Sequence, residues 1–181
     1  FERLIDARGL DLLPEPPADL PALLAYANGT AGTLTDLCLA ALGGVDRQDD
    51  LARLAGIAVA LTGLLRALPF HAREHWVTLP SSLMEEQGVG LRELYDLKPG
   101  AGLNRIVETV ADSARGHLAE ARALRRHVPK RALAALLPLT LAEGHLNRLA
   151  KNGHDVFDTS LGEKSPLAAW RLSWMALRGR V

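Results

Sequence analysis

Apolar residues recur at every third or fourth position along most of this 181-residue chain, and no segment alternates apolar and polar residues as a half-buried strand does. This spacing gives each helix one apolar face, which must be buried against other helices. The pattern predicts an all-α fold with long helices over residues 20–42, 49–68, 103–127, 129–151 and 166–177. The length suits one hydrophobic core, so we expect a single domain over residues 1–181.

Prolines and glycines set the expected limits of these helices. Pro69 lacks an amide hydrogen, so we expect the second helix to end or kink there, and we expect a kink at Pro138 within the fourth. Gly29 and Gly32 fall inside the first long helix, where each costs roughly 1 kcal/mol relative to alanine. Two glycines within one turn indicate the close approach of another helix or of a ligand.

Charge and cysteine content exclude several classes of protein. The chain has 21 basic and 21 acidic residues, and this balance argues against non-specific nucleic-acid binding. The longest apolar run, residues 54–65, is shorter than a transmembrane helix. Cys38 is the single cysteine, which favours a reducing compartment, and we expect it to be buried as a small apolar side chain. The chain begins at Phe1 without a visible signal peptide, so we expect a fragment or trimmed domain.

The stretch LRALPFHAR (65–73) places Arg66, Pro69 and His71 at the end of a predicted helix, and three interpretations compete. In the first, HAREH (71–75) is an inverted zinc-protease motif, in which two histidines on one helix face bind zinc and a glutamate activates water. A catalytic zinc needs a third protein ligand, and the sequence after residue 75 shows no obvious helix with a glutamate to supply it. In the second, the stretch is the remnant of a diphosphate site. In the third, Pro69 simply terminates a helix.

The order of the segments resembles the squalene/phytoene synthase family. Its members carry a helix of the form Y-C-x-x-V-A-G-x-V-G, and YANGTAGTLT (26–35) keeps Tyr26, Ala31 and Gly32. They then carry a segment like L-G-x-A-x-Q-L-T-N-I-L-R-D-V-x-E-D-A-R-x-G-R-x-Y-L-P, which AGIAVALTGLLRALPFHAREHWVTLP (55–80) follows without a gap. The residues that match in this segment are Gly56, Ala58, Leu61, Thr62, Leu65, Arg66, Ala72, Arg73, Leu79 and Pro80. The resemblance implies an isoprenoid-synthase-like helical bundle, with the family's N-terminal helices missing before Phe1.

The departures from this pattern concern the metal site. In the family's enzymes two aspartates one helical turn apart bind Mg²⁺, which holds the substrate diphosphate; the resemblance places Ala67 and His71 at these positions. Mg²⁺ prefers hard oxygen ligands, which alanine does not offer and histidine replaces poorly. The family's other aspartate-rich motif would lie before Phe1. We therefore expect no catalytic residue, metal or cofactor; Mg²⁺ would be needed only in the alternative, an active head-to-head prenyltransferase that condenses prenyl diphosphates.

One branch of the family is particularly similar. The pattern L-R-A-x-P-x-H, together with HVP (127–129) and DVF (155–157), resembles the complex I assembly factor 6-like proteins. This resemblance implies a non-catalytic assembly or binding factor for the respiratory NADH dehydrogenase (complex I), with a protein partner and no nucleic acid. The expected location is the cytoplasm or the periphery of the inner membrane, on the mitochondrial matrix side in a eukaryote. The 17 arginines against 4 lysines favour a bacterial source.

We also expect an apolar cavity between the helices, able to bind a prenyl or other lipid chain without converting it. Its expected lining residues are Tyr26, Thr30, Gly32, Leu34, Ala58, Thr62, Leu65, Arg66 and His71. Arg66 and His71 would together hold an anion in this cavity. The equal alternative is that Arg66 pairs with a carboxylate in the core.

Overall fold

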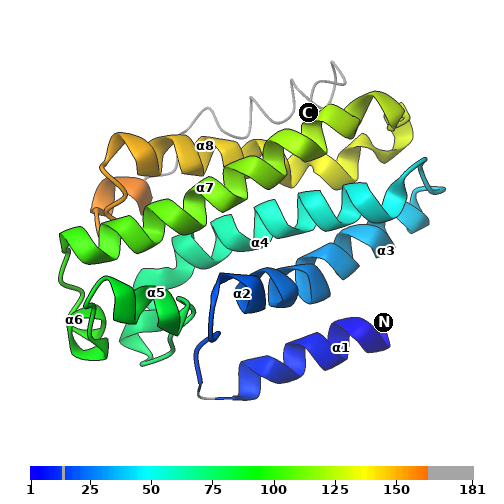
Figure 1. Ribbon diagram of the computed structural model, residues 1–181. Coiled ribbons are helices and arrows are strands. Elements are labelled where there is room, and N and C mark those ends of the chain that lie inside the picture. The colour runs from blue at the N-terminus through cyan, green and yellow to red at the C-terminus, as the bar shows by residue number, and fades with distance from the viewer. Residues whose placement is uncertain (14, 163–181) are drawn as a thin grey trace.

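The computed structural model describes residues 1–13 and 15–162, which form an all-α bundle with no β-strand among them. The expected last helix, with Trp170 and Trp174, lies outside the described residues. The long helices α4 (Gln48–Arg73), α7 (Ala101–Ala123) and α8 (Leu137–Lys151) run along one another (Figure 1). The all-α expectation is confirmed.

Helix α4 is the central helix because it is apolar nearly all the way round. It packs against α7, α8 and α3 (Thr33–Ala41), and its fully buried side chains include Leu61, Leu65 and Leu68. By length and composition alone α4 could cross a membrane, yet 61% of its apolar window is buried within the bundle. Core helices of this kind meet the same criterion, so the observation is weak evidence for a membrane span.

Of the two outcomes expected at Pro69, an end of the helix is wrong, since α4 continues to Arg73. A proline removes one backbone hydrogen bond, and the turns beyond it supply others. The amides of Glu74, His75 and Trp76 donate to carbonyls of the last helical turn, at 2.9–3.3 Å. Buried packing along α4 therefore outweighs the local cost of the proline, about 3 kcal/mol in an exposed helix.

The predicted helix over 20–42 is present, but a π-helical turn (Asn28–Gly32) divides it into α2 (Leu20–Ala27) and α3. Asp19 caps its start by accepting a hydrogen bond from the Ala22 amide at 2.8 Å. Gly43 and Gly44, with φ of +92° and +68°, end it, and the Gly44 amide donates to the Leu39 carbonyl.

The π-helical turn shifts the later part of this helix by one residue. A continuous α-helix would place Leu34 and Cys38 on the same face as Leu23 and Ala27. In the structure Leu34 is 51% exposed and Cys38 is exposed, while Leu39 is completely buried. The expectation that Cys38 is buried is therefore wrong, because the wider turn rotates position 39 toward α4 in its place.

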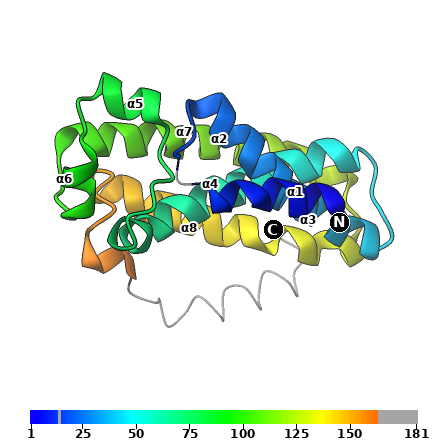
Figure 2. The same cartoon turned by 90° about the horizontal axis from the view of Figure 1, so that it is seen from below.

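The shorter elements close the two ends and one face of the bundle. Helix α1 (Glu2–Arg8), followed by a 3₁₀ turn (Gly9–Leu12), lies over one face of the bundle and runs roughly along the long helices when seen from below (Figure 2). Helices α5 (Ser81–Glu86) and α6 (Leu91–Tyr95) cover one end. Two 3₁₀ stretches, Leu124–His127 and Lys130–Leu136, connect α7 to α8.

Pro138 lies in the first turn of α8 rather than in the middle of a helix. The expected kink at this residue is therefore wrong. Proline is well tolerated at this position because the amide hydrogen that it lacks would have no partner within the helix.

Candidate functional site

Two adjacent cavities, of about 600 and 230 Å³, lie between α4 and α8 and share Arg66 and His145. We call the combined space the α4–α8 groove. Its lining residues are Val59, Thr62, Gly63, Leu65, Arg66, Ala67, Pro69, Phe70 and Arg73 of α4, Pro138, Leu141, Ala142, His145 and Arg148 of α8, and residues 156–159 and Leu161. The groove has a cationic section and an apolar section.

The cationic section carries three guanidinium groups, those of Arg66, Arg73 and Arg148. None of the three forms an ion pair with a carboxylate in residues 1–13 and 15–162. Asp158 is the acidic residue that lines this section, and it accepts a hydrogen bond from Asn152 at 2.9 Å. Arginine forks bind phosphate and carboxylate groups strongly, so this section suits an anion.

The apolar section is lined by Val59, Pro138, Leu141 and Ala142, together with Thr62. The Thr62 hydroxyl donates to the Ala58 carbonyl at 2.7 Å, so its hydrogen is already used within α4. This section therefore offers mainly dispersion and hydrophobic contact. An elongated ligand with an apolar chain and an anionic end matches the two sections together.

His145 stands at the junction of the two sections. Its side chain is only 4% exposed, and neither ring nitrogen has a hydrogen-bond partner within the described residues. Burial, together with the charges of Arg148 and Arg66, lowers the pKa of this imidazole to about 4. His145 is therefore neutral at pH 7, with one nitrogen able to donate and the other able to accept.

The predicted pocket residues do not all meet in this groove. Thr62, Leu65 and Arg66 line it, as does Ala67, one of the two positions where the family's enzymes have aspartate. Ala58 is completely buried in the core. Leu34, half exposed on α3, lies on the surface.

Thr30 and Gly32 belong to the crossing of helices α2–α3 and α4. The Thr30 hydroxyl, in the π-helical turn, donates to the carbonyl of Tyr26 in α2 at 2.8 Å. A Cβ atom built on Gly56 would lie 2.3 Å from the Cα of Gly32. The glycines thus serve close helix approach, which is one of the two roles expected for Gly29 and Gly32.

His71 does not converge with Arg66 on one anion. The two residues are five positions apart on α4, about 140° around the helix axis. The His71 ring packs against Trp76, with ring centroids 4.3 Å apart, and burial lowers its pKa. An anion held jointly by Arg66 and His71 is therefore incompatible with this geometry.

The two histidines of HAREH also face different neighbours. His75 lies beyond the end of α4 with a φ of +55°, and its ring meets Tyr95 edge-on at 4.6 Å. In the part of the chain that the structure describes, no group of three histidine, cysteine, aspartate or glutamate residues could hold a metal ion. The zinc interpretation thus has no third ligand in this part of the chain.

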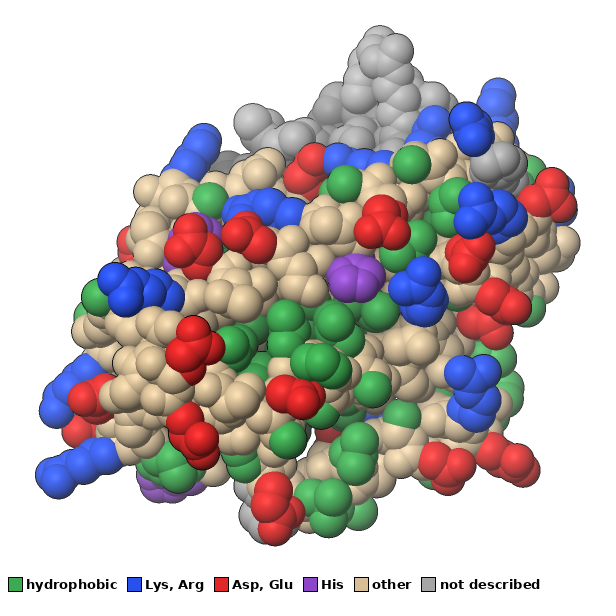
Figure 3. Space-filling model, in the orientation of Figure 1, with side chains coloured by type: hydrophobic (Ala, Val, Ile, Leu, Met, Phe, Trp, Pro, Cys, Tyr) green, Lys and Arg blue, Asp and Glu red, His purple; other side chains and the backbone are tan. Residues whose placement is uncertain are grey.

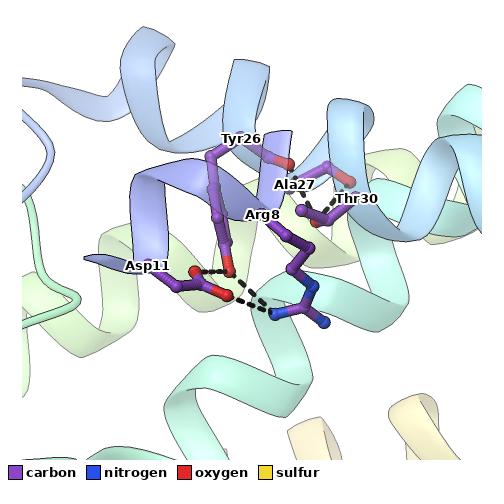
Figure 4. A network of polar contacts seen from close by, with 5 residues as sticks. All are labelled: Arg8, Asp11, Tyr26, Ala27 and Thr30. Atoms are coloured by element: carbon purple, nitrogen blue, oxygen red, sulfur yellow. Dashed lines mark hydrogen bonds and ion pairs between the residues drawn. The ribbon is translucent and has the colours of Figure 1, made fainter. Parts of the chain in front are cut away.

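Tyr26 lies in a separate polar network with Arg8 and Asp11 (Figure 4). The Tyr26 hydroxyl donates to Asp11 at 2.6 Å, while Arg8 donates to Asp11 at 3.0 Å and to Tyr26 at 3.1 Å. Burial and the hydrogen bond to Asp11 raise the pKa of the Tyr26 hydroxyl to about 12. Tyr26 lines a cavity of about 240 Å³ on the α1 side of the bundle, away from the α4–α8 groove.

The donor set of the groove does not suit Mg²⁺. Hard oxygen ligands, preferably carboxylates, are needed to hold this ion. The α4 positions of the family's aspartates carry Ala67 in the groove and His71 against Trp76, and the groove lining has three guanidinium groups but one carboxylate, that of Asp158. Positive charge of this density repels a divalent cation.

Sequence comparison identifies the family. Residues 1–178 match the family model for squalene/phytoene synthase. The chain belongs to this family. Among its relatives, the mouse protein named "NADH dehydrogenase (ubiquinone) complex I, assembly factor 6" is 31% identical over 95% of this chain. The chain spans 53% of that relative's length.

Solved structures of family enzymes share the fold. A squalene synthase from Alicyclobacillus acidocaldarius matches with a TM-score of 0.77 at 21% identity, over 84% of this chain and 59% of that chain. A dehydrosqualene synthase in complex with a ligand also matches with a TM-score of 0.77, at 20% identity over 97% of this chain and 62% of that one. At these identities the likeness establishes the architecture alone.

Sequence reasoning did not single out His145 or Arg148, which help to form the groove. A signal was nevertheless present, because His145 interrupts the buried stripe formed by Ala142, Leu146 and Leu149 on α8. A titratable residue on such a stripe, with an arginine three positions later, is unusual for a purely structural helix face.

Proposed function

We propose that this chain acts as a non-catalytic assembly factor for the respiratory NADH dehydrogenase. The observation that carries the proposal is the groove face of α4, which presents Ala67 beside Arg66 and Arg73 where the family's enzymes place metal-binding aspartates. Such a face supports anion or protein contacts but not metal-assisted ionisation of a prenyl diphosphate. Similarity to the mouse assembly factor supports the same role.

The proposal includes a protein partner among the subunits or assembly proteins of complex I, and no requirement for Mg²⁺ or another cofactor. It places the protein in the cytoplasm or mitochondrial matrix, at the periphery of the inner membrane, where complex I is built.

Deletion of the gene in its own host tests the role. We expect fully assembled complex I to fall on native gels, and the wild-type gene to restore it. Normal complex I in the deletion strain would contradict the proposal.

An active prenyltransferase is the competing function. Incubation of the purified protein with Mg²⁺ and radiolabelled farnesyl or geranylgeranyl diphosphate separates the two functions. The assembly-factor proposal predicts no condensed C30 or C40 product. Formation of either product would show that the missing carboxylates are dispensable and would overturn the non-catalytic assignment.

A second candidate function is the binding of a prenyl diphosphate or another anionic lipid without conversion. The two-part α4–α8 groove favours this function, because its apolar section could take the chain and its three arginines the anionic end. Equilibrium binding of farnesyl diphosphate without Mg²⁺ is the direct measurement. Unlabelled inorganic pyrophosphate and farnesol, used as competitors, distinguish recognition of the head group from recognition of the chain.

A further inference from the structure

His145 lies where the two sections of the α4–α8 groove meet, because its side chain lines both cavities. The residue is 4% exposed, and neither Nδ1 nor Nε2 has a hydrogen-bond partner among residues 1–13 and 15–162. Buried polar groups in folded proteins are nearly always hydrogen-bonded, because removing such a group from water without a partner is unfavourable. The unpaired ring therefore points to a ligand that supplies the missing partners.

The imidazole of His145 needs two partners of opposite kind. Burial and the charges of Arg148 and Arg66 keep it neutral at pH 7. One ring nitrogen then donates a hydrogen bond and the other accepts one. An ionised phosphate or carboxylate oxygen satisfies the donating nitrogen, but it has no hydrogen to offer to the accepting nitrogen. A group that carries a hydrogen, such as a hydroxyl, is needed for the accepting nitrogen.

The cationic section selects the charge of the ligand. Its lining has the guanidinium groups of Arg66, Arg73 and Arg148 against one carboxylate, that of Asp158. On the face of the molecule in Figure 3, by contrast, basic and acidic side chains are interspersed. The excess of positive charge is therefore a local property of the groove. A phosphate monoester has a charge of about −1.5 to −2 at pH 7 and three acceptor oxygens, so it matches three arginines better than a carboxylate does.

The chain that follows the groove is poorly suited to fill the cationic section. Residues 163–181 come directly after the groove residue Leu161 and contain four basic residues but one acidic residue, Glu163. Like charges repel, so this segment as a whole does not neutralise the three arginines. A separate anionic ligand is the better match. The experiment below uses the protein as its own gene encodes it, so that every other part of that protein can compete for the groove.

We infer that the α4–α8 groove binds a single-chain phosphate ester with a free hydroxyl group between the phosphate and the chain, the class of the lysophosphatidates. The three arginines hold the phosphate, and the chain enters the apolar section beside Leu141 and Ala142. His145 donates to a phosphate oxygen and accepts from the hydroxyl. The inference rests on the second candidate function above, since it names the ligand class and the specificity-determining residue of the same groove. A prenyl diphosphate has no such hydroxyl and leaves the accepting nitrogen unpaired.

Two ligands that differ by one hydroxyl group test the inference. 1-Decanoyl lysophosphatidate and its 2-deoxy analogue, decanoyl propanediol phosphate, are each titrated into the full-length protein by calorimetry, without Mg²⁺ and below the concentration at which micelles form. We expect the lysophosphatidate to bind about tenfold more tightly, because its hydroxyl pairs a buried nitrogen that the analogue leaves unpaired. Equal affinities, as would follow if ordered water already satisfies His145, would overturn the inference.

His145→Leu assigns the preference to this residue. The variant should bind the two ligands with equal affinity, because leucine neither donates nor accepts a hydrogen bond. The matched control is His117→Leu on α7, outside the groove, where Nδ1 lies 2.8 Å from the Ser113 carbonyl oxygen. It should keep the tenfold preference. A preference that persists in His145→Leu, folded with wild-type circular dichroism, would overturn the inference. If His145→Leu does not fold, the comparison of the two ligands on wild type still decides.

Farnesyl diphosphate separates failure of the inference from failure of the function on which it rests. If wild type binds farnesyl diphosphate but does not distinguish the two test ligands, binding of anionic lipids stands and selection of the hydroxyl is wrong. If wild type binds none of the three, as it would when another part of the protein fills the groove, both are wrong. The assembly role is tested independently by deletion of the gene.

Discussion

Gly32 and Gly56 meet backbone to backbone where the helix of α2 and α3 crosses α4. A Cβ atom on Gly56 would lie 2.3 Å from both the Cα and the amide nitrogen of Gly32 and 2.6 Å from the Ala31 carbonyl carbon. Real Cβ atoms essentially never approach other atoms so closely. The main chains of the two helices are therefore in direct contact, and the contact falls within the π-helical turn Asn28–Gly32.

Replacement of Gly56 by alanine should therefore destabilise the fold. We expect a loss of about 2–3 kcal/mol, because the steric cost of separating two packed helices exceeds the gain in helix propensity. Gly63→Ala is the matched control, two turns further along α4, where an added Cβ meets no atom within 4 Å. It should gain up to about 1 kcal/mol. Urea denaturation of both variants measures the difference, and equal stability would contradict the close contact.

The helices were predictable because their apolar periodicity is strong, and the close approach was predictable because glycine is costly within a helix. The rotation of α3 about its own axis, which decides the residues that face the core, was not predictable. The π-helical turn inserts the equivalent of one residue, and no residue type in NGTAG (28–32) specifies it. Leu34 and Cys38 were consequently placed on the wrong face. The same tertiary packing continues α4 through Pro69, where local reasoning predicts an end or a kink.

The site was predictable only in the part that lies on α4. Arg66, Leu65 and Thr62 follow from the segment that resembles the family's enzymes, and all three line the groove. The opposite wall comes from His145 and Arg148, about eighty residues after Arg66, and depends on the packing of α8 against α4. Spacing along one helix cannot predict which residue of another helix will face it.

The Arg8–Asp11–Tyr26 network should control the attachment of α1. Asp11→Asn removes the charge that holds Arg8 and leaves one neutral acceptor oxygen in place of two, so it weakens the hydrogen bonds from Arg8 and from the Tyr26 hydroxyl and should cost about 1 kcal/mol. Amide exchange over residues 2–12 should accelerate about fivefold with little change in α4. The Tyr26 pKa should fall from about 12 toward 10, as followed by ultraviolet titration. Glu2→Gln is the control. If amide exchange of α1 is unchanged in Asp11→Asn, the packing of Ala7 against Gly29 is enough to hold α1 on the bundle, and the network does not control its attachment.

Burial of neutral His145 should make stability depend on pH. Its pKa is about 4 in the folded protein and near 6.5 when unfolded, so the unfolded state binds more protons between these values. Stability is then complete above pH 6.5 and falls as pH decreases toward 4. Between pH 7 and 5 the loss should be about 2 kcal/mol. His145→Leu should remove this pH-dependent part of the free energy of unfolding. The difference in urea midpoint between wild type and variant, measured at each pH, separates the contribution of His145 from that of His71. A difference that does not change with pH would refute the assignment.

The three arginines of the α4–α8 groove should act on an anion together. Arg66→Gln and Arg148→Gln should each weaken binding of farnesyl diphosphate about tenfold, because a charge-assisted hydrogen bond to phosphate is lost. Arg53→Gln supplies the control, since this exposed arginine lies on the same helix but outside the groove. Higher salt should reduce the difference by screening the exposed charges. Isothermal titration calorimetry without Mg²⁺ measures all three variants. Equal affinity for farnesyl diphosphate in Arg66→Gln and Arg53→Gln would show that the groove is not the anion site. A loss of affinity confined to Arg66→Gln and Arg148→Gln would place the diphosphate between α4 and α8.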